Sequence, residues 1–154
     1  MYYCFCRLYF ILGSGGLKMN KIKTMFNVHF SSLRLDWNTP KWLYEILDKE
    51  FKFNFDPCPS NPSFDGLKID WGSRNFVNPP YGREIPKWIE KGYNESLKGK
   101  LVVFLIPSRT DTKWFHNFIM KSDEIRFITG RLKFDDYKNS APFPSAIVIF
   151  RGKK

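Results

Sequence analysis

Four consecutive residues, Asn78-Pro79-Pro80-Tyr81, combine hydrogen-bond acceptors with a flat aromatic ring. The Asn78 side-chain oxygen and the Pro79 carbonyl can each accept one hydrogen of an amino group. The prolines hold these acceptors rigidly because their φ angles are fixed. The Tyr81 ring can stack on a nucleobase, an interaction worth roughly 1–3 kcal/mol. The segment therefore predicts a site that binds a base through its exocyclic amino group.

The reaction that this arrangement favours is methyl transfer to adenine N6. This nitrogen is a poor nucleophile because its lone pair is delocalised into the ring. When two acceptors bind the hydrogens of this nitrogen, they push it towards a tetrahedral geometry, with the lone pair directed at an electrophilic methyl group. No general base of shifted pKa is needed before transfer. The alternative is a proline-rich turn with a packed aromatic ring. The short apolar strand predicted at 75–77, directly before Asn78, favours the catalytic interpretation.

Composition limits the class of protein. A chain of 154 residues is one domain's worth, and 43% hydrophobic with 18% aromatic residues argue against disorder. Lysine and arginine exceed aspartate and glutamate by 25 to 15, which suggests a polyanionic partner, although ordinary solubility charge is the alternative. Three cysteines and two histidines show no zinc-site spacing, so we expect a reduced, cytosolic chain without a metal.

The remaining pattern predicts the elements that position the site. Helix and strand signals alternate, which indicates an α/β fold. Helices are expected at 40–49, with Thr39 as cap and Pro40 in the first turn, at 85–97, and around 114–119. Strands are expected at 51–55, 75–77 and 101–106, followed by 124–128, 132–134 and 146–150. The last three follow one another too closely for helical crossovers and should be antiparallel.

Asp56 and Asn78 then follow strand ends, where open α/β sheets bind ligands. Arg109, Arg131 and Lys133 lie in polar stretches near strands and could contact DNA phosphates, or form surface ion pairs.

From Phe30 to about Phe150, an ordered set of motifs resembles the phage-type DNA N6-adenine methyltransferases, small Dam-like enzymes. The matching segments are Asp36-Trp37-Asn38-Thr39-Pro40, Phe55-Asp56-Pro57-Cys58, Asp65-Gly66-Leu67, Val77-Asn78-Pro79-Pro80-Tyr81-Gly82, residues 105–112, residues 130–134 and Ala141-Pro142-Phe143. The resemblance implies an S-adenosylmethionine-dependent, Rossmann-like fold, here a mixed sheet with antiparallel C-terminal strands. It also implies site-specific methylation of adenine N6 in DNA.

The resemblance also implies cofactor-binding residues. These are Trp37, Thr39, Pro40, Asp56, Pro57 and Cys58. Thr39 and Pro40 would border the methionine part of S-adenosylmethionine, and Asp56 would bind its amino group directly or through water. Cys58 is interpreted as a packing thiol.

One departure from the family is the segment Pro59-Ser60-Asn61-Pro62-Ser63, which replaces the glycine-rich turn of many related enzymes. Cofactor contacts there cannot be transferred by position. Asp65 and Asp70 are both candidates for an acidic contact to the ribose or adenine. Asp70 is preferred because it follows a possible strand end at Ile69, and a solvated turn carboxylate is the alternative.

The amino terminus carries a separate hypothesis. Residues 1–12 are apolar but too short to span a bilayer, and Arg7 interrupts them, so no membrane anchor is expected. Gly15 to Met19 is what translation of a ribosome-binding sequence before a start codon would give. We therefore expect the working protein to start at Met19 or Met25. Residues 1–24 would be a non-native or disordered extension, and residues 25–154 the methyltransferase domain.

Other substrates and roles stay open. The same tetrapeptide serves amino groups of RNA bases and of protein glutamine, and a catalytically silent nucleic-acid-binding module is a further alternative. A membrane-associated small protein is another, which rests only on residues 1–12 and fails if the protein starts at Met19. In duplex DNA the target adenine must flip out, at a cost of a few kcal/mol. The expected place of action is the cytoplasm of a bacterium or phage-infected host. The sequence indicates neither an oligomeric state nor a restriction partner.

Overall fold

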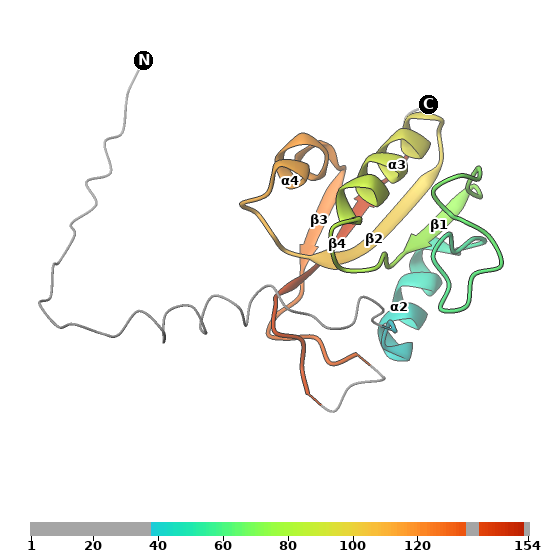
Figure 1. The fold of residues 1–154 in the computed structure, drawn as a ribbon. Coiled ribbons are helices and arrows are strands. Elements are labelled where there is room, and N and C mark those ends of the chain that lie inside the picture. Colours follow the sequence, from blue (N-terminus) through green and yellow to red (C-terminus); the bar gives the residue numbers. More distant parts are fainter. Residues whose placement is uncertain (1–37, 135–138, 153–154) are drawn as a thin grey trace, which may run out of the picture. The chain divides into compact units, whose positions relative to one another are not determined.

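The computed structural model describes residues 38–134 and 139–152 (Figure 1). Within these ranges helices and strands alternate around one mixed sheet. The helical elements are α2 (Lys41–Phe51), α3 (Ile85–Leu97), α4 (Lys113–Asn117) and the 3-10 turn η1 (Ile119–Lys121). The strands are β1 (Arg74–Val77), β2 (Leu101–Pro107), β3 (Glu124–Phe127) and β4 (Ser145–Phe150). Trp37 and the proposed 1–24 extension lie outside the described residues.

The four described strands lie in the order β1-β2-β4-β3. β1 and β2 are parallel, and α3 connects them, as a parallel pair requires. β4 runs antiparallel to β2 on one side and to β3 on the other. The predicted mixed sheet with antiparallel C-terminal strands is therefore confirmed.

Helices α2 and α3 cover opposite faces of the sheet. Phe76 of β1 packs edge-on against Tyr44 of α2, with ring centroids 5.2 Å apart. Its neighbour Val77 points the other way and pairs with Phe104 of β2. Phe104 lies under α3, so closely that a Cβ added at Gly92 would be 2.3 Å from its ring. Because both faces are covered, β2 is buried along nearly its whole length, as its continuous apolar run predicts.

The strand predicted at 51–55 is wrong except at its last residue. Phe51 ends α2, and Lys52 follows in the left-handed conformation with φ 54°. Only Phe55 forms a parallel bridge, to Asn75 of β1. The apolar alternation has another cause, because Phe53 packs on Phe51 and on the aromatic cluster beside it rather than in a ladder.

The strand predicted at 132–134 is also absent from the structure. Leu132 and Phe134 are buried on either side of the exposed Lys133, so the alternation itself is present. One backbone bond, from Ala141 N to Leu132 O at 2.8 Å, replaces a ladder. Phe134 packs on Tyr81, with ring centroids 6.1 Å apart, which explains its burial.

The other elements agree with the predictions apart from their ends. The helix expected at 114–119 divides into α4 and η1, and β3 ends at Phe127. The predicted cap of α2 is wrong: Pro40 is the N-cap, without a side-chain cap bond, and α2 begins at Lys41. The Thr39 hydroxyl instead accepts a hydrogen bond from the side chain of Asn78, the residue after β1.

Candidate active site

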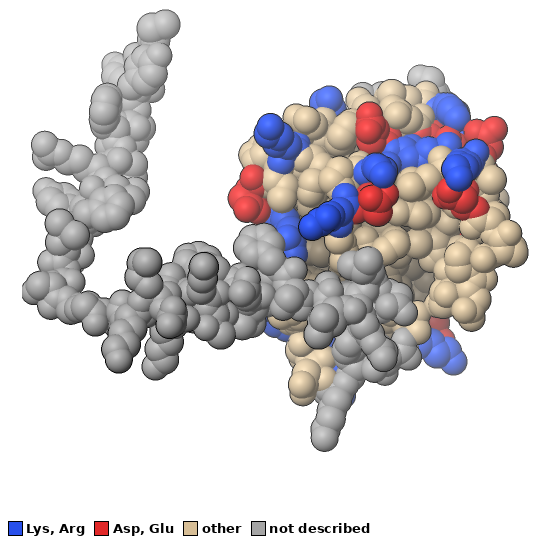
Figure 2. Space-filling view, viewed as in Figure 1, with Lys and Arg blue, Asp and Glu red and all other residues tan. Residues whose placement is uncertain are grey.

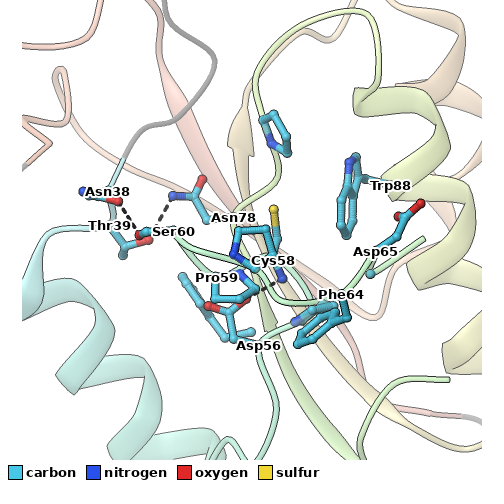
Figure 3. A pocket seen from close by; sticks show the side chains of 15 residues that line it. Asn38, Thr39, Asp56, Cys58, Pro59, Ser60, Phe64, Asp65, Asn78 and Trp88 are labelled. Carbon is cyan, nitrogen blue, oxygen red and sulfur yellow. Dashed lines mark hydrogen bonds between the residues drawn. The ribbon is translucent and has the colours of Figure 1, made fainter. Parts of the chain in front are cut away.

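A pocket of about 480 Å³ lies where β1 ends, a size typical of small-molecule sites (Figure 3). Its walls come from the residues before α2, the loop after Phe55, the end of β1 and α3. Six of the residues predicted for the site line it: Thr39, Asp56, Pro57, Cys58, Asn78 and Pro80. The structure thus brings together segments that are up to 41 positions apart in the sequence.

Asp56 supplies a largely buried carboxylate to this pocket. Its Oδ1 accepts a hydrogen bond from the Cys58 backbone N–H at 2.8 Å. Burial raises the pKa of Asp56 above its ordinary value, although the Cys58 bond opposes that shift. Among the described residues, no lysine or arginine forms an ion pair with this carboxylate. A cationic ligand would therefore gain from binding here, because it would stabilise the ionised form.

Cys58 forms part of the pocket wall and packs against the core. Burial and the neighbouring charge of Asp56 raise the pKa of its thiol to about 12. The thiol is therefore protonated near neutral pH, which suits a packing role better than a nucleophilic one.

Asn78 directly follows β1, and its amide reaches across to the segment before α2. Asn78 Nδ2 donates to Thr39 Oγ1 at 3.0 Å. One residue earlier, Asn38 Oδ1 accepts from the Ser60 hydroxyl at 2.7 Å. Figure 3 shows both bonds, with the Asn78 nitrogen directed at Thr39 and its oxygen on the other side of the amide. The loop after β1 is thus bonded to Thr39, and the loop after Asp56 is bonded to its neighbour Asn38.

Tyr81 does not line the pocket and is only 4% exposed. Its hydroxyl donates to the Leu105 carbonyl of β2 at 3.2 Å, and burial raises its pKa well above the ordinary value. The rings of Phe134 and Phe143 pack against it at interplanar angles of 76°. The hydroxyl bond fixes the loop to β2, and the two rings hold the Tyr81 side chain in place. Stacking of Tyr81 on a base stays a prediction.

Of the two acidic candidates, Asp65 lines the pocket and Asp70 does not. The Asp70 side chain is 83% exposed and pairs with Lys98 at 3.2 Å. Asp65 accepts from the Leu67 backbone N–H and pairs with Lys68 at 3.1 Å. The hydrogen bond from Lys68 holds the pKa of Asp65 below its ordinary value. The geometry therefore favours the candidate that sequence reasoning placed second.

The pocket residues that were not predicted for the site include Phe64, Trp88 and Gly66. Trp88 belongs to α3, and its spacing in the sequence indicates only a helix. Its ring is buried and stacks near Trp71 at 6.3 Å. A Cβ on Gly66 would lie 2.0 Å from the Pro57 carbonyl, so the loop closes backbone to backbone there. The Asp65-Gly66-Leu67 motif is the sequence signal from which this loop could have been predicted. A local pattern, however, does not show which part of the fold such a loop packs against.

The remaining predicted residues are not part of the pocket lining. Pro40 is buried beside Thr39, and Pro79 is buried in the loop after β1. Arg131 and Lys133 are exposed, whereas Arg109 is half-buried. None of these five residues lines the pocket.

Two comparisons identify the family. A model of the family described as "DNA N-6-adenine-methyltransferase (Dam)" matches residues 29–152. A protein named DNA N-6-adenine-methyltransferase, from Haemophilus phage HP1 (strain HP1c1), is 30% identical over 139 residues, which cover 76% of this chain and 79% of the phage protein. In the part of the chain that the structure describes, no helix is long and apolar enough to cross a membrane. The chain therefore belongs to the DNA N-6-adenine-methyltransferase (Dam) family.

Proposed function

We propose that this chain methylates N6 of adenine in DNA with S-adenosylmethionine as the methyl donor, and that the pocket after β1 holds both the donor and the reacting nitrogen. The observation that carries this proposal is the meeting of Asn78 with the buried Asp56 carboxylate in one pocket. Such a crevice outside the carboxyl ends of parallel strands is the usual ligand site of Rossmann-like sheets, which supports that fold assignment.

The residues of the pocket fit S-adenosylmethionine chemically. The cofactor carries an ammonium group, a sulfonium group and an adenosine. Asp56 offers a largely buried carboxylate that no described cation neutralises, which suits the ammonium group. Phe64 and Trp88 offer aromatic surface for a flat ring, and the carboxylate of Asp65 suits ribose hydroxyls.

When bound, the cofactor supplies an electrophilic methyl group. The chain's own contribution is to bind and orient the adenine amino group. Asn78 Oδ1 and the Pro79 carbonyl accept its two hydrogens, which localises the lone pair on N6. Pro80 keeps the loop rigid, and the Tyr81 hydroxyl bond to Leu105 fixes the loop to β2.

DNA binding is proposed for the basic residues outside the pocket. Arg109, Arg131 and Lys133 would contact phosphates, which position a duplex without reading its sequence. The target adenine would then leave the stack and enter the pocket. The phage origin of the relative supports action on DNA inside a bacterial or phage-infected cell.

The decisive experiment is transfer of labelled methyl from S-adenosylmethionine to unmethylated DNA, with the nucleosides identified by mass. We expect labelled N6-methyladenine from the wild-type chain and a loss of at least about a hundredfold for Asn78→Ala. Binding of S-adenosylmethionine is measured separately by calorimetry on both proteins.

Three outcomes would replace the proposal. Label on RNA would change the substrate to RNA bases, and label on protein would change it to glutamine side chains. Cofactor binding without transfer to any acceptor would favour a catalytically silent nucleic-acid-binding module.

A further inference from the structure

The amide of Asn78 has two sides with opposite hydrogen-bonding character. Its oxygen accepts hydrogen bonds, whereas its nitrogen can only donate them. The amino group of adenine has hydrogens to donate, so it requires the oxygen. An amide rotated by 180° would present a donor to a donor. Catalysis by Asn78 therefore depends on which side of the amide faces the base.

We infer that Thr39 is a positioning residue that holds the Asn78 amide with its oxygen directed at the substrate. This inference rests on the proposed function. Its basis is the 3.0 Å bond from Asn78 Nδ2 to Thr39 Oγ1, which uses the nitrogen side of the amide and places the oxygen on the opposite side (Figure 3). Thr39 thus acts through Asn78 and not on the reacting atoms.

The two ends of this bond are held by rigid structure on either side. Thr39 precedes Pro40, which is buried, and α2 anchors this end through its buried Leu43 and Leu47. Asn78 follows Val77, which is fully buried and paired with β2. The geometry of the bond therefore does not depend on a flexible surface loop.

A second bond holds the same segment from the cofactor side. Asn38 Oδ1 accepts from the Ser60 hydroxyl at 2.7 Å, and Ser60 belongs to the pocket loop that follows Asp56. Asn38 and Thr39 therefore connect the proposed cofactor loop to the proposed catalytic loop. Thr39 thus contacts Asn78 and does not cap α2, whose N-cap is Pro40.

The test compares variants that differ in one chemical property. Thr39→Val keeps the side-chain shape and removes the hydroxyl, whereas Thr39→Ser keeps the hydroxyl. Asn78→Asp replaces the amide with a carboxylate, which has an acceptor oxygen on both sides and so needs no orientation. The rate constant kcat for methyl transfer, KM for DNA and the Kd of S-adenosylmethionine are measured for each protein.

We expect Thr39→Val to lower kcat by about tenfold, the effect of losing one well-placed hydrogen bond, with a smaller change in KM for DNA. Thr39→Ser should recover most of this loss. In the Asn78→Asp background, Thr39→Val should change kcat by less than about twofold, because a carboxylate cannot be wrongly rotated. Equal losses in both backgrounds would overturn the inference, since they would show that Thr39 only stabilises the loop.

A readout without cofactor or DNA uses the side-chain NH₂ signals of Asn78 in a ¹⁵N spectrum, assigned by their absence in Asn78→Asp. Thr39→Val should shift the hydrogen-bonded proton, and Thr39→Ser should not. Unchanged signals in Thr39→Val would contradict the inference even if Asn78→Asp is inactive. If the wild-type chain transfers no methyl group to DNA, the proposed function fails instead, and the spectrum still decides whether the contact exists.

Discussion

Asp56 combines three properties at the scale of one residue: it directly follows Phe55, which forms a parallel bridge to β1, it is largely buried, and its pKa is raised by that burial. A carboxylate in this environment is stabilised by a bound cation, and the ammonium group of the proposed cofactor supplies one. The position of Asp56 was predictable because proline ends the preceding extended segment. Its burial was not predictable, because it depends on the loop that folds back over it.

Replacement of Asp56 by asparagine should weaken binding of S-adenosylmethionine by about tenfold or more, because the ammonium group loses a charged partner. In the wild-type protein, binding should also weaken as the pH falls through the raised pKa of Asp56, since the protonated form cannot pair with a cation. Calorimetry between pH 4 and pH 8 measures both effects.

The matched control is Asp70→Asn, which removes an exposed carboxylate outside the pocket. It should leave cofactor affinity within about twofold of wild type. Equal affinities of the Asp56→Asn and wild-type proteins would show that the ammonium group binds elsewhere.

The choice between Asp65 and Asp70 shows a limit of sequence reasoning at this scale. Asp70 was preferred because Ile69 suggested a strand end, but no strand forms there in the described residues. Asp65 lines the pocket because Gly66 allows the loop to approach the Pro57 carbonyl. That approach joins residues nine positions apart without any periodic pattern, so hydrophobic periodicity carried no information about it.

Substitution of Gly66 by alanine should move this loop. The added Cβ would lie 2.0 Å from a backbone oxygen, and such overpacking typically costs about 1–3 kcal/mol. We expect a lower thermal midpoint together with weaker binding of S-adenosylmethionine. Ser63→Ala, at an exposed position of the same loop, is the control and should change neither quantity. A Gly66→Ala protein with wild-type stability and affinity would refute the packing argument.

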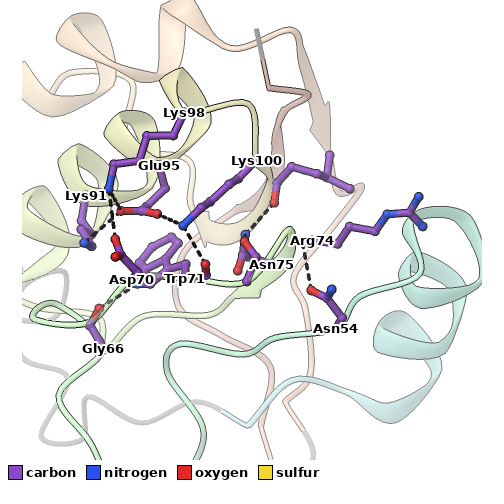
Figure 4. A network of polar contacts seen from close by, with 12 residues as sticks. Asn54, Gly66, Asp70, Trp71, Arg74, Asn75, Lys91, Glu95, Lys98 and Lys100 are labelled. Carbon is purple, nitrogen blue, oxygen red and sulfur yellow. Dashed lines mark hydrogen bonds and ion pairs between the residues drawn. The ribbon is translucent and has the colours of Figure 1, made fainter. Parts of the chain in front are cut away.

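At the scale of elements, α3 is attached to its surroundings by a buried carboxylate (Figure 4). The Glu95 side chain is 1% exposed, and Lys91, Lys98 and Lys100 all contact it. Burial alone would raise its pKa, but the three lysines outweigh burial and lower the pKa to about 2. Lys100 also donates to the Trp71 carbonyl at 2.7 Å. These contacts thus join the end of α3 to the residue directly before β2 and to the backbone at Trp71.

Folding stability should depend on this group at acid pH. The pKa of Glu95 falls from an ordinary 4.5 to about 2 on folding, so the unfolded chain binds more protons between these values. Its stabilising contribution is complete above pH 4.5 and is lost as the pH falls towards 2. Urea unfolding as a function of pH measures this loss.

The Glu95→Gln variant should be less stable by about 1–3 kcal/mol near neutral pH, less than for a fully buried pair because the lysines stay partly hydrated. It should also show a weaker dependence of stability on pH between 4.5 and 2. Glu90→Gln, at an exposed position of the same helix, is the control. A Glu95→Gln protein as stable as this control would contradict the assignment.

The elements themselves were largely predictable, with two instructive failures. The continuous apolar run at 101–106 correctly predicted β2, and the close spacing of the last strands correctly predicted the antiparallel pairing of β3 with β4. Apolar and polar residues also alternate in the segments 51–55 and 132–134. Their side chains, however, pack on aromatic rings, and their backbones form no strand ladder. Alternation reports which side chains are buried, and it does not report whether the backbone has a partner strand.

At the scale of the whole molecule, the charge of +10 predicts salt-dependent DNA binding. Each phosphate contact contributes about 0.9 to the slope of log affinity against log salt concentration. The double variant Arg131→Ala/Lys133→Ala should reduce that slope and weaken binding of every sequence alike. Titrations at several salt concentrations measure the slope. Lys49→Ala, at an exposed position of α2, is the control, and an unchanged slope in the double variant would place the phosphate contacts elsewhere.

The strand order has a consequence for the making of the protein. β4 is the last described strand in the chain, yet it lies between β2 and β3. During translation, β3 emerges from the ribosome before β4, the described strand with which it pairs. The edge of β2 that pairs with β4 also stays open until Phe150 has emerged. The sheet therefore closes only after β4 has emerged, and until then two open strand edges are exposed to aggregation and to chaperones.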